Sequence, residues 1–388
     1  MRILIVHNIL NDSVSVSGVL KHYAFLANAW IEAGHQTDFV LARAGFPQLR
    51  KLAPEAGLIS SDNLFDATKN MSKTWQNMPA FLWRMWHAHW LRLRERYDVV
   101  YASGPFIFEV YAARVLARRL RAKWAAKVQH VLHSQPKRDG VFNRMFLQSE
   151  KISARWMNRD AAVIMCLSKV VQDDYRKLEE EMGMRPAETV QVGCGIDFAA
   201  MLDGRKETKE YDAVFLGRLH EQKGVFDLPA TWRAVVDARP DARLLVIGSG
   251  PHRDAMEARL RELGLAATVT VAGGVDEAEK NRLLARSQVG ISLSYEEGWG
   301  LSVTEFLAAG LPVVAYQLPV FEQVFPQRLE SVKAGDAEGA GKEIIALLQD
   351  ETRRKERGAE GREFVRQYDY REIARKELEV LRQAVEGA

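Results

Sequence analysis

Two successive series of short, β-branched apolar runs, separated by amphipathic stretches, constrain the fold of this chain most strongly. Such alternation is typical of parallel sheets, because each parallel strand needs a crossover, usually a helix, to reach the next. The first series predicts strands at residues 3–6, 37–41, 99–102, 125–130 and 161–166. The second predicts strands at residues 213–216, 243–247, 268–271, 289–293 and 313–315. The chain is therefore predicted to be an α/β protein with two doubly wound domains.

The predicted boundary between the domains is a charged segment. The chain has 388 residues, which fits two domains of roughly 190 residues each. Residues 203–210, DGRKETKE, are nearly free of apolar side chains, which indicates a linker. We predict one domain over residues 1–202 and a second over 203–362. Residues 363–388 are predicted to form a long charged helix that packs back on the N-terminal domain.

Composition indicates a cytoplasmic protein. No apolar run approaches the roughly 20 residues that a membrane-spanning helix needs, and the N-terminal MRILIVHNIL has no small-residue cleavage site. Cys166 and Cys194 are the only cysteines, and they form no CxxC pair. This argues against a disulfide framework and against a cysteine metal site.

Positive charge is concentrated in the first half of the chain. Residues 1–190 hold 27 Lys and Arg against 18 Asp and Glu, while the remainder holds 27 against 33. A basic N-terminal half favours an anionic partner or an anionic surface. The alternative is that its arginine-rich helices are simply solvated, and the sequence leaves both open.

The strongest local motif is SYEEGWGLSVTEFLAAG at residues 294–310, where a strand leads through a glycine loop into a helix. Gly298 and Gly300 allow a ligand to approach the backbone closely, and free amides at the helix start attract anions. Glu297 and Glu305 stand eight residues apart, and a carboxylate there can accept both hydroxyls of a ribose. The alternative for Glu305 is a capping box with Ser302, and Glu297 could be an ordinary loop acid.

Two further glycine motifs follow predicted strands. GRLHEQKG at residues 217–224 begins with Gly217, which permits a tight turn, and contains Arg218 and Lys223, two cations suited to a diphosphate. The alternative is a basic surface loop. IGSGP, which contains Gly248, is weak evidence by itself, because many α/β crossovers carry glycines.

Together these motifs make the chain resemble family 4 of the retaining glycosyltransferases, which have the GT-B fold of two facing Rossmann-like domains with a cleft between them. The matching pieces stand in order along nearly the whole chain: Ser17-Gly18, His130, Ser168, Gly195-Ile196-Asp197, GRLHEQKG, IGSGP and EGWGLSVTEFLAAGLPVV. Glu297 and Glu305 form the E-x7-E pattern of that family. Two positions depart from it, since Ser17 replaces a glycine and Cys194 replaces an asparagine.

The resemblance implies roles for individual residues. The C-terminal domain would bind a nucleotide-sugar donor, and the N-terminal domain would bind the acceptor. The expected donor-binding residues are Gly18, Gly217, Arg218, Lys223, Gly248, Gly298, Trp299, Gly300, Leu301 and Glu305. The expected catalytic residues are His130, Glu297, Arg218 and Lys223. Arg218 and Lys223 would hold the diphosphate and Glu305 the ribose. Glu297 would bind the donor sugar, and His130 would lie beside it, with His133 a weaker candidate.

We predict that the reaction needs neither a metal nor another cofactor. No DxD-like site follows a predicted strand, and Asp173-Asp174 falls on a predicted helix. The leaving diphosphate would be stabilised by Arg218, Lys223 and helix amides instead. The resemblance implies retention of anomeric configuration. Glu297 is expected to position the sugar without acting as a nucleophile.

The acceptor is expected to be a glycan or a lipid-linked molecule, and no nucleic acid is expected as a partner. Two segments combine aromatic and basic residues: 75–97 (Trp75, Trp83, Trp86, Trp90, Arg84, Arg92, Arg94 and Arg96) and 111–127 (Arg114, Arg118, Arg119, Arg121, Lys123 and Lys127). Such segments suit peripheral contact with an anionic membrane. The alternative, which we favour for the tryptophans, is a core stripe of Leu82, Trp86, Trp90 and Leu93.

Other functions remain as alternatives. A sugar-nucleotide epimerase could use the same architecture, and a non-catalytic protein could bind the same donor. An NAD-linked oxidoreductase is disfavoured, because no GxGxxG follows the first predicted strand. UDP- and GDP-sugars are both compatible with the sequence. A role in surface polysaccharide or glycolipid assembly is an expectation from the resemblance.

Overall fold

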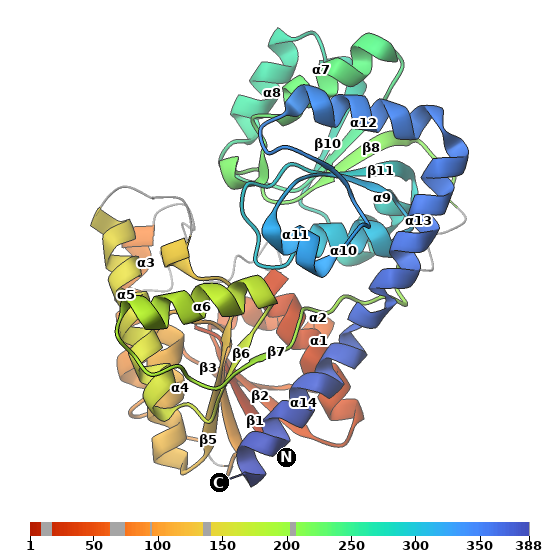
Figure 1. The fold of residues 1–388 in the computed structure, drawn as a ribbon. Helices are drawn as coiled ribbons and strands as arrows, with labels where there is room; N and C mark the ends of the chain where they lie inside the picture. Colours follow the sequence, from red (N-terminus) through yellow and green to blue (C-terminus); the bar gives the residue numbers. More distant parts are fainter. Residues whose placement is uncertain (9–17, 63–73, 94, 135–140, 202–206, 388) are drawn as a thin grey trace. The chain divides into compact units, whose positions relative to one another are not determined.

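The chain forms two α/β units, which are drawn in Figure 1. The computed structural model describes residues 1–8, 18–62, 74–93, 95–134, 141–201 and 207–387, with the side chains of 74–77 and 141–143 left aside. Unit 1 consists of Met1–Gly195 and Tyr370–Ala388, and unit 2 of Ile196–Asp369. The polypeptide therefore passes between the units twice, at 195–196 and at 369–370. Residues 203–206 of the predicted linker lie outside the described residues.

Unit 1 contains a parallel seven-stranded sheet in the order β3-β2-β1-β4-β5-β6-β7. Its strands are β1 (Arg2–Val6), β2 (Gln36–Leu41), β3 (Gly57–Ser60), β4 (Val99–Ala102), β5 (Lys123–Val128), β6 (Val163–Cys166) and β7 (Thr189–Gln191). The five predicted strands are confirmed, with their ends shifted by a few residues. The edge strands β3 and β7 are short and only half-buried, so they lack the apolar signal by which the others were predicted.

Helices cover both faces of this sheet, as a doubly wound fold requires. They are α1 (Gly18–Glu32), α2 (Phe46–Leu52), α3 (Thr74–His87), α4 (Ile107–Leu120), α5 (Val141–Asp160), α6 (Lys169–Glu181) and α14 (Tyr370–Glu386). Helices α4, α5 and α6 share one apolar core with the side chains of Leu4, Val100 and Ile164. On the other face α14 packs against α1, and Trp30 of α1 donates to the Ala374 carbonyl over 2.9 Å.

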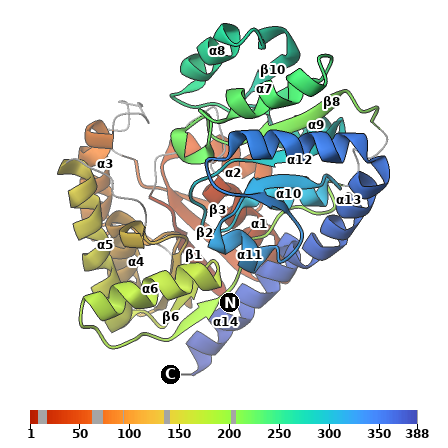
Figure 2. The ribbon, with the colours of Figure 1, turned by 45° about the horizontal axis from the view of Figure 1, so that its top comes forward.

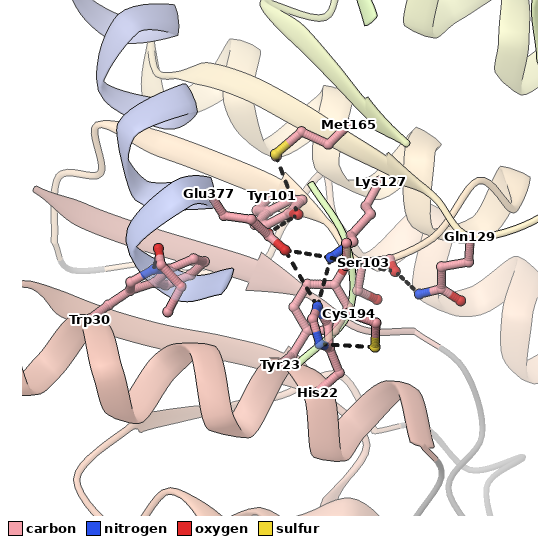
Figure 3. A network of polar contacts seen from close by, with 12 residues as sticks. His22, Tyr23, Trp30, Tyr101, Ser103, Lys127, Gln129, Met165, Cys194 and Glu377 are labelled. Atoms are coloured by element: carbon pink, nitrogen blue, oxygen red, sulfur yellow. Dashed lines mark hydrogen bonds and ion pairs between the residues drawn. The ribbon is translucent and has the colours of Figure 1, made fainter. Parts of the chain in front are cut away.

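The C-terminal helix α14 is joined to the sheet by a buried polar network (Figure 3). Glu377 of α14 is fully buried, accepts a hydrogen bond from Tyr101 over 2.7 Å and forms an ion pair with Lys127. Lys127 also lies 2.6 Å from His22 Nε2, and His22 Nδ1 lies 3.4 Å from Cys194 Sγ. The network therefore ties α14 to α1, to the sheet, and to the residue that precedes Gly195, where the chain leaves unit 1.

Unit 2 contains a parallel six-stranded sheet in the order β10-β9-β8-β11-β12-β13. Its strands are β8 (Tyr211–Leu216), β9 (Leu244–Ile247), β10 (Val269–Gly273), β11 (Ser287–Ser292), β12 (Val313–Tyr316) and β13 (Glu330–Val332). Its helices are α7 (Leu228–Ala238), α8 (Arg253–Glu262), α9 (Glu277–Ala285), α10 (Leu301–Ala308), α11 (Pro319–Val324), α12 (Ala337–Gln349) and α13 (Glu351–Val365). The five predicted strands are confirmed. The strand order reverses between β8 and β11, which is where ligands bind in such sheets.

The structure corrects the predicted C-terminal helix. The helix predicted over residues 363–385 is two helices, since α13 ends at Val365 and α14 begins at Tyr370. Between them lies a short 3-10 turn, and Ile196 donates to the Tyr368 carbonyl over 3.0 Å at this point. Charged residues dominate on both sides of this turn, so composition alone did not reveal the break.

The predicted core stripe on the Trp-rich segment is wrong for three of its four members. Leu82, Trp86 and Trp90 are 58%, 54% and 51% exposed, and only Leu93 packs partly against the core. The buried side of α3 and of the turn after it is formed instead by Ala80, Phe81, Arg84 and Ala88. Within the described residues, no helix has both the length and the apolar character that crossing a membrane requires.

Several of the predicted basic residues are buried. Arg84 is 2% exposed and donates to the Asn8 carbonyl over 2.9 Å. Lys127 is paired with Glu377, and Arg114 with Asp160. Arg94 and the side chain of Trp75 lie outside the described residues. The basic surface of unit 1 is therefore formed by fewer residues than the sequence suggested.

Candidate functional site

The three predicted glycine motifs of unit 2 meet at the carboxyl ends of neighbouring strands. Gly217, after β8, donates to the Ile247 carbonyl at the end of β9 over 3.0 Å. Tyr295, after β11, donates to the Gln222 carbonyl over 2.9 Å. The loops after β8, β9 and β11 are thus joined by backbone hydrogen bonds at the point where the strand order reverses. The site lies where a doubly wound sheet binds ligands.

Two glycines in these loops are required by the backbone. Gly248 has φ +141°, and a Cβ there would lie 1.9 Å from the Gly217 carbonyl oxygen. Gly300 has φ +101°, and a Cβ there would lie 2.6 Å from the ring of Phe321. Gly217 differs, since a Cβ would lie 3.9 Å from Lys223 and φ is not positive. A side chain at Gly217 would therefore meet its neighbours only at ordinary van der Waals distance, so the turn does not itself require glycine.

Lys223 and Glu297, predicted to contact diphosphate and sugar respectively, are paired with each other. Lys223 Nζ lies 2.5 Å from Glu297 Oε1, and Ser294 Oγ donates to the same oxygen over 2.9 Å. The Lys223 side chain is 23% exposed and that of Glu297 11%. One cation and one carboxylate are therefore held together at the end of β11, each partly open to solvent.

Glu305 is buried in α10 beside a lysine that the sequence analysis missed. Lys280 of α9 donates to Glu305 Oε1 over 2.6 Å and to Glu277 Oε2 over 2.7 Å. Lys280 and Glu305 are 6% and 7% exposed. Lys280 lies four residues after Asp276, the N-cap of α9. From the sequence alone, a lysine at this spacing from an acid is expected to form an exposed ion pair. No local signal distinguishes this lysine, because the packing of α9 beside α10 is what buries it.

The alternative of a capping box at Ser302 is wrong. The N-cap of α10 is Gly300, in a left-handed conformation, and no side chain caps it. Glu305 is the fifth residue of the helix, too far along it to cap the first turn. Its carboxylate accepts a hydrogen bond from Lys280 instead. With no side-chain cap, the first-turn amides of α10 retain their capacity to bind an anion.

Of the predicted donor-binding residues, Trp299 is buried and Arg218 is exposed. Trp299 is 4% exposed, donates to Thr304 Oγ1 over 3.2 Å and meets the ring of Tyr368 edge-on. Its side chain therefore supports the loop, and only its backbone remains for a ligand. Arg218 is exposed and donates a long hydrogen bond of 3.4 Å to Gln222 Oε1. Its guanidinium is the most accessible cation of the cluster.

Two predicted residues, Gly18 and His130, belong to unit 1, so their position against the unit 2 cluster stays a prediction. Gly18 is the exposed first residue of α1, and Ser17 lies outside the described residues. His130 follows β5 and is half-buried, with its ring edge-on to Phe106 at 6.1 Å between centroids. His133 instead bonds Glu150 over 2.6 Å, and Glu150 also accepts from the Leu132 amide. His133 thus has a structural role.

A second polar cluster, also missed by the sequence analysis, lies where the strand order of unit 1 reverses, between β1 and β4. His7 Nδ1 lies 2.8 Å from Ser103 Oγ, and Ser103 donates to Glu109 Oε1 over 2.7 Å. All three side chains are fully buried. Burial raises the pKa of Glu109 to about 8, although hydrogen bonds from Ser103 and the Asn8 backbone act in the other direction. This cluster can hold a proton near neutral pH.

The described side chains form no group of three or more His, Cys, Asp or Glu that could hold a metal ion. Asp173 lies in α6 and pairs with Lys169, as expected for a helix surface. Independence from metal stays a prediction.

Comparison with known protein families matches nearly all of the chain. Residues 17–195 match the family described as glycosyl transferase 4-like domain, and residues 201–364 match glycosyl transferases group 1. The first match falls in unit 1 and the second in unit 2.

Individual relatives are more distant. A phosphatidyl-myo-inositol mannosyltransferase of Mycobacterium leprae is 32% identical over 171 residues, which is 43% of this chain and 45% of the relative. The aligned part is thus less than half of that protein. Among solved structures, Anabaena HepE in complex with UDP and glucose has a TM-score of 0.75 and 16% identity, covering 99% of this chain and 100% of that chain. A sucrose-phosphate synthase from Thermosynechococcus elongatus has a TM-score of 0.76 and 17% identity, covering 100% of both chains. At 16% and 17% sequence identity, the similarity to these two structures shows a shared fold.

Proposed function

We propose that this chain, which belongs to the GT-B glycosyltransferases built from a 4-like domain and a group 1 domain, transfers a hexose-type sugar from a UDP- or GDP-sugar to a glycan or lipid-linked acceptor. The observation that carries the proposal is the pairing of Lys223, on the loop after β8 that also bears Arg218, with Glu297 on the loop that leads into α10, the helix of the Lys280–Glu305 pair. The HepE complex with UDP and glucose supports a nucleotide-sugar donor.

Glu305 is proposed to bind the ribose of the donor. Lys280 holds one carboxylate oxygen of Glu305, which fixes the orientation of that carboxylate in a site with little solvent. A fixed carboxylate can accept hydrogen bonds from a diol with little loss of side-chain entropy on binding. Lys280 is thus a positioning residue.

Arg218, Lys223 and the open amides of α10 are proposed to bind the diphosphate. Negative charge develops on this group as the sugar leaves, and preorganised cations and amides stabilise it. One such donor typically contributes about 3 kcal/mol to lowering the barrier. Lys223 is already placed by Glu297, so it needs little rearrangement on binding.

The sugar is proposed to be transferred with retention of configuration. The bond from the anomeric carbon to the phosphate oxygen breaks, and the acceptor oxygen bonds to the same carbon on the same face. The acceptor proton passes to the departing phosphate oxygen. Glu297 positions the sugar hydroxyls, since Lys223 and Ser294 already occupy one of its oxygens. His130 is proposed to contact the sugar from unit 1, and Gly18 the diphosphate.

A lipid-linked acceptor in surface polysaccharide or glycolipid assembly, at a cytoplasmic location, is the proposed cellular role. The named activity of the mycobacterial relative, which mannosylates phosphatidyl-myo-inositol, supports a lipid acceptor. Such a role would bring unit 1 close to a membrane surface.

The test is a thermal-shift screen of the full chain against UDP, GDP, ADP, TDP and their sugars, without metal. A ligand that binds only the folded state raises the Tm. We expect one base to give a selective rise that is lost in Glu305→Gln and Arg218→Ala. Arg261→Ala, at an exposed arginine on α8, serves as the matched control. No rise with any nucleotide would contradict the proposal.

Turnover separates the transferase from the two alternatives. Conversion of the donor sugar without acceptor would indicate an epimerase, and binding without turnover on any acceptor would indicate a non-catalytic protein. Anomeric configuration of the product, measured by nuclear magnetic resonance, tests retention.

A further inference from the structure

The cluster of His7, Ser103 and Glu109 is fully buried at the ends of β1 and β4, and it has no part in the proposed binding of the donor. The Ser103 hydroxyl stands between the other two side chains, 2.8 Å from His7 Nδ1 and 2.7 Å from Glu109 Oε1. Burying a carboxyl group costs free energy, and its hydrogen bonds compensate only while the backbone around it keeps this arrangement.

Glu109 holds the loop after β4 in a closed turn. It is the third residue of α4, and its amide donates to the carbonyl of Phe106 over 3.0 Å. Its side chain reaches back to Ser103, at the start of the loop. A Cβ at Gly104 would lie 2.4 Å from Glu109 Oε2, so the loop wraps tightly around the carboxyl group. The backbone path of residues 103–106 therefore depends on this one side chain.

The same loop supports the segment that carries His130. Gln129 Nε2 donates to the Ser103 carbonyl over 2.8 Å, as Figure 3 shows, and Tyr23 donates to the same carbonyl over 2.9 Å. The His130 ring meets the ring of Phe106 edge-on, with 6.1 Å between the centroids. The two residues that follow β5 are thus held by the loop after β4, one at each end of that loop.

Neighbouring elements brace this loop. Helix α4 packs against β1, β4 and β5, and Figures 1 and 2 show it beside α5. Phe106 meets Phe146 of α5 edge-on at 6.3 Å, and Asn8, after β1, donates to the Phe108 carbonyl over 3.1 Å. A shift of the loop would therefore disturb contacts with both β1 and α5, so the loop provides a firm support for residues 129 and 130.

We propose that Ser103 and Glu109 are positioning residues that set the place of the His130 side chain for sugar transfer. Gln129 and Phe106 connect them to it. This positioning role rests on the proposed function, in which His130 contacts the donor sugar. Neither Ser103 nor Glu109 contacts the sugar itself, because both side chains are fully buried. A displacement of about 1 Å at a reacting centre can lower a rate about 100-fold, so the loss of such a support has a measurable effect.

The proton on Glu109 decides how the cluster is bonded. The Ser103 hydroxyl has one proton to donate and two neighbours that can accept it. With an ionised carboxylate, the hydroxyl donates to Glu109 and accepts from His7 Nδ1–H. With a neutral carboxyl group, Glu109 can donate to the hydroxyl, which then turns to His7. Burial favours the neutral form and raises the pKa of Glu109 to about 8.

The charged and titratable groups that face Glu109 come from three elements. His7 of β1 lies 3.8 Å from its carboxyl oxygen, Tyr23 of α1 bonds the Ser103 carbonyl, and Arg84 of α3 is directed to a backbone carbonyl at the end of β1. Burial is the largest influence on the pKa of Glu109. Because an ionised carboxylate in such surroundings is unfavourable, we expect the loop after β4 to shift above pH 8 and to loosen its hold on residues 129 and 130.

The first test follows the imidazole signals of the full chain by nuclear magnetic resonance as pH is raised. We expect the signals of His7 and His130 to share an inflection near pH 8, which Glu109→Gln removes. Gln129→Met should keep the inflection of His7 and reduce that of His130, because it cuts only the connection between them. The signal of His252, in unit 2, is the control and should be the same in all three proteins.

Rate measurements test the consequence for the reaction. The probe is hydrolysis of UDP-glucose and of GDP-mannose, in which water replaces the acceptor. Glu109→Leu should lower kcat on the order of 10- to 100-fold. Its affinity for nucleoside diphosphates should stay unchanged, because the ribose and cationic contacts proposed for them belong to unit 2.

Two further variants separate positioning from stability. Glu109→Gln keeps an acceptor for Ser103, so it should retain most of the rate at neutral pH and lose the decline that the parent shows above pH 8. Glu179→Leu, at a fully buried glutamate of α6, is the matched control. It should lower the Tm and leave kcat of the folded protein as in the parent.

Parallel titrations of His130 in the parent and in Glu109→Gln would overturn the proposal, as would an unchanged kcat in a folded Glu109→Leu. Full additivity of Glu109→Leu with His130→Ala would also overturn it, because a residue that acts through His130 has no further effect once His130 is absent. If Glu109→Leu does not fold, the parent and Glu109→Gln decide. A chain that neither binds nor hydrolyses a nucleotide sugar would contradict the proposed function, while the titrations would still show whether Glu109 holds His130.

Discussion

Lys280 of α9 donates a hydrogen bond to Glu305 of α10 over 2.6 Å, and neither side chain is more than 7% exposed. The carboxylate of Glu305, which we propose binds the ribose, is therefore oriented by a lysine that stands 25 residues earlier in the chain. This pair connects the folding of unit 2 to its proposed chemistry, because the same contact orders α9 against α10 and fixes the ligand-binding group.

Lys280→Met should weaken nucleotide binding without removing any group proposed to touch the ligand. Glu305 would lose its buried partner, which typically costs about 3 kcal/mol or more in stability. We expect a lower Tm and a smaller thermal shift with the preferred nucleotide. Lys342→Met, at an exposed lysine of α12, is the control. An unchanged nucleotide affinity would show that Lys280 has only a structural role.

Arg218→Ala should reduce affinity for nucleoside diphosphates while leaving stability unchanged. Its guanidinium is exposed and makes a long hydrogen bond of 3.4 Å to Gln222. A charge-assisted contact to phosphate contributes about 1.5–3 kcal/mol, so affinity should fall on the order of 10- to 100-fold. Isothermal titration with the diphosphate measures this. A loss equally large for the free nucleoside would contradict a diphosphate contact.

Glu377→Gln should destabilise unit 1 strongly. Burial by itself would raise the pKa of Glu377, but Lys127 and His22 outweigh it and lower the pKa to about 2. The ion pair therefore stabilises the fold above pH 4.5, and this contribution of about 3 kcal/mol is lost as pH falls towards 2. Leaving Lys127 buried without its counter-charge costs about 3–5 kcal/mol.

Denaturant unfolding at several pH values measures the effect of Glu377→Gln. The variant should lose less stability than the parent between pH 4.5 and 2. Lys127→Met/Glu377→Leu removes both charges and should recover much of the loss. A single variant as stable as the parent would show that the ion pair does not hold α14 in place.

Glu109 should make the protein less stable as pH rises. Its pKa of about 8 in the folded state lies above its ordinary value, so the folded state holds a proton that the unfolded state has released. Stability therefore falls between pH 4.5 and 8, by up to about 5 kcal/mol. Glu109→Gln keeps an acceptor for Ser103 and should flatten this part of the profile. Parallel profiles for variant and parent would contradict the raised pKa.

Activity, once a donor is known, should survive removal of divalent metal. The charge on the diphosphate is proposed to be met by Arg218, Lys223 and the α10 amides. Rates with EDTA should equal those with added Mg²⁺ or Mn²⁺. Complete loss in EDTA, with rescue by either ion, would show that a metal carries out this role.

The sequence by itself determined the buried strands and the glycine-containing loops that follow them. Buried strands such as β4 and β8 are short apolar runs, and this signal is local. Gly248 and Gly300 were recognisable because each lies in a loop after a predicted strand, although the contacts that exclude a side chain there, with Gly217 and Phe321, are tertiary. Glu297 and Glu305 could be singled out because their spacing follows a strand, loop and helix that the sequence specifies.

Tertiary structure decided which side of each helix is buried and which charges meet. Trp86 and Trp90 have the spacing of a core stripe, yet they face outward, because Ala80, Phe81, Arg84 and Ala88 of the same segment already fill the buried side of α3. Lys280 meets Glu305 through the packing of two helices, and Glu377 meets Lys127 across 250 residues. Such pairs have no local signature, since their free energy depends on burial that only the assembled fold supplies.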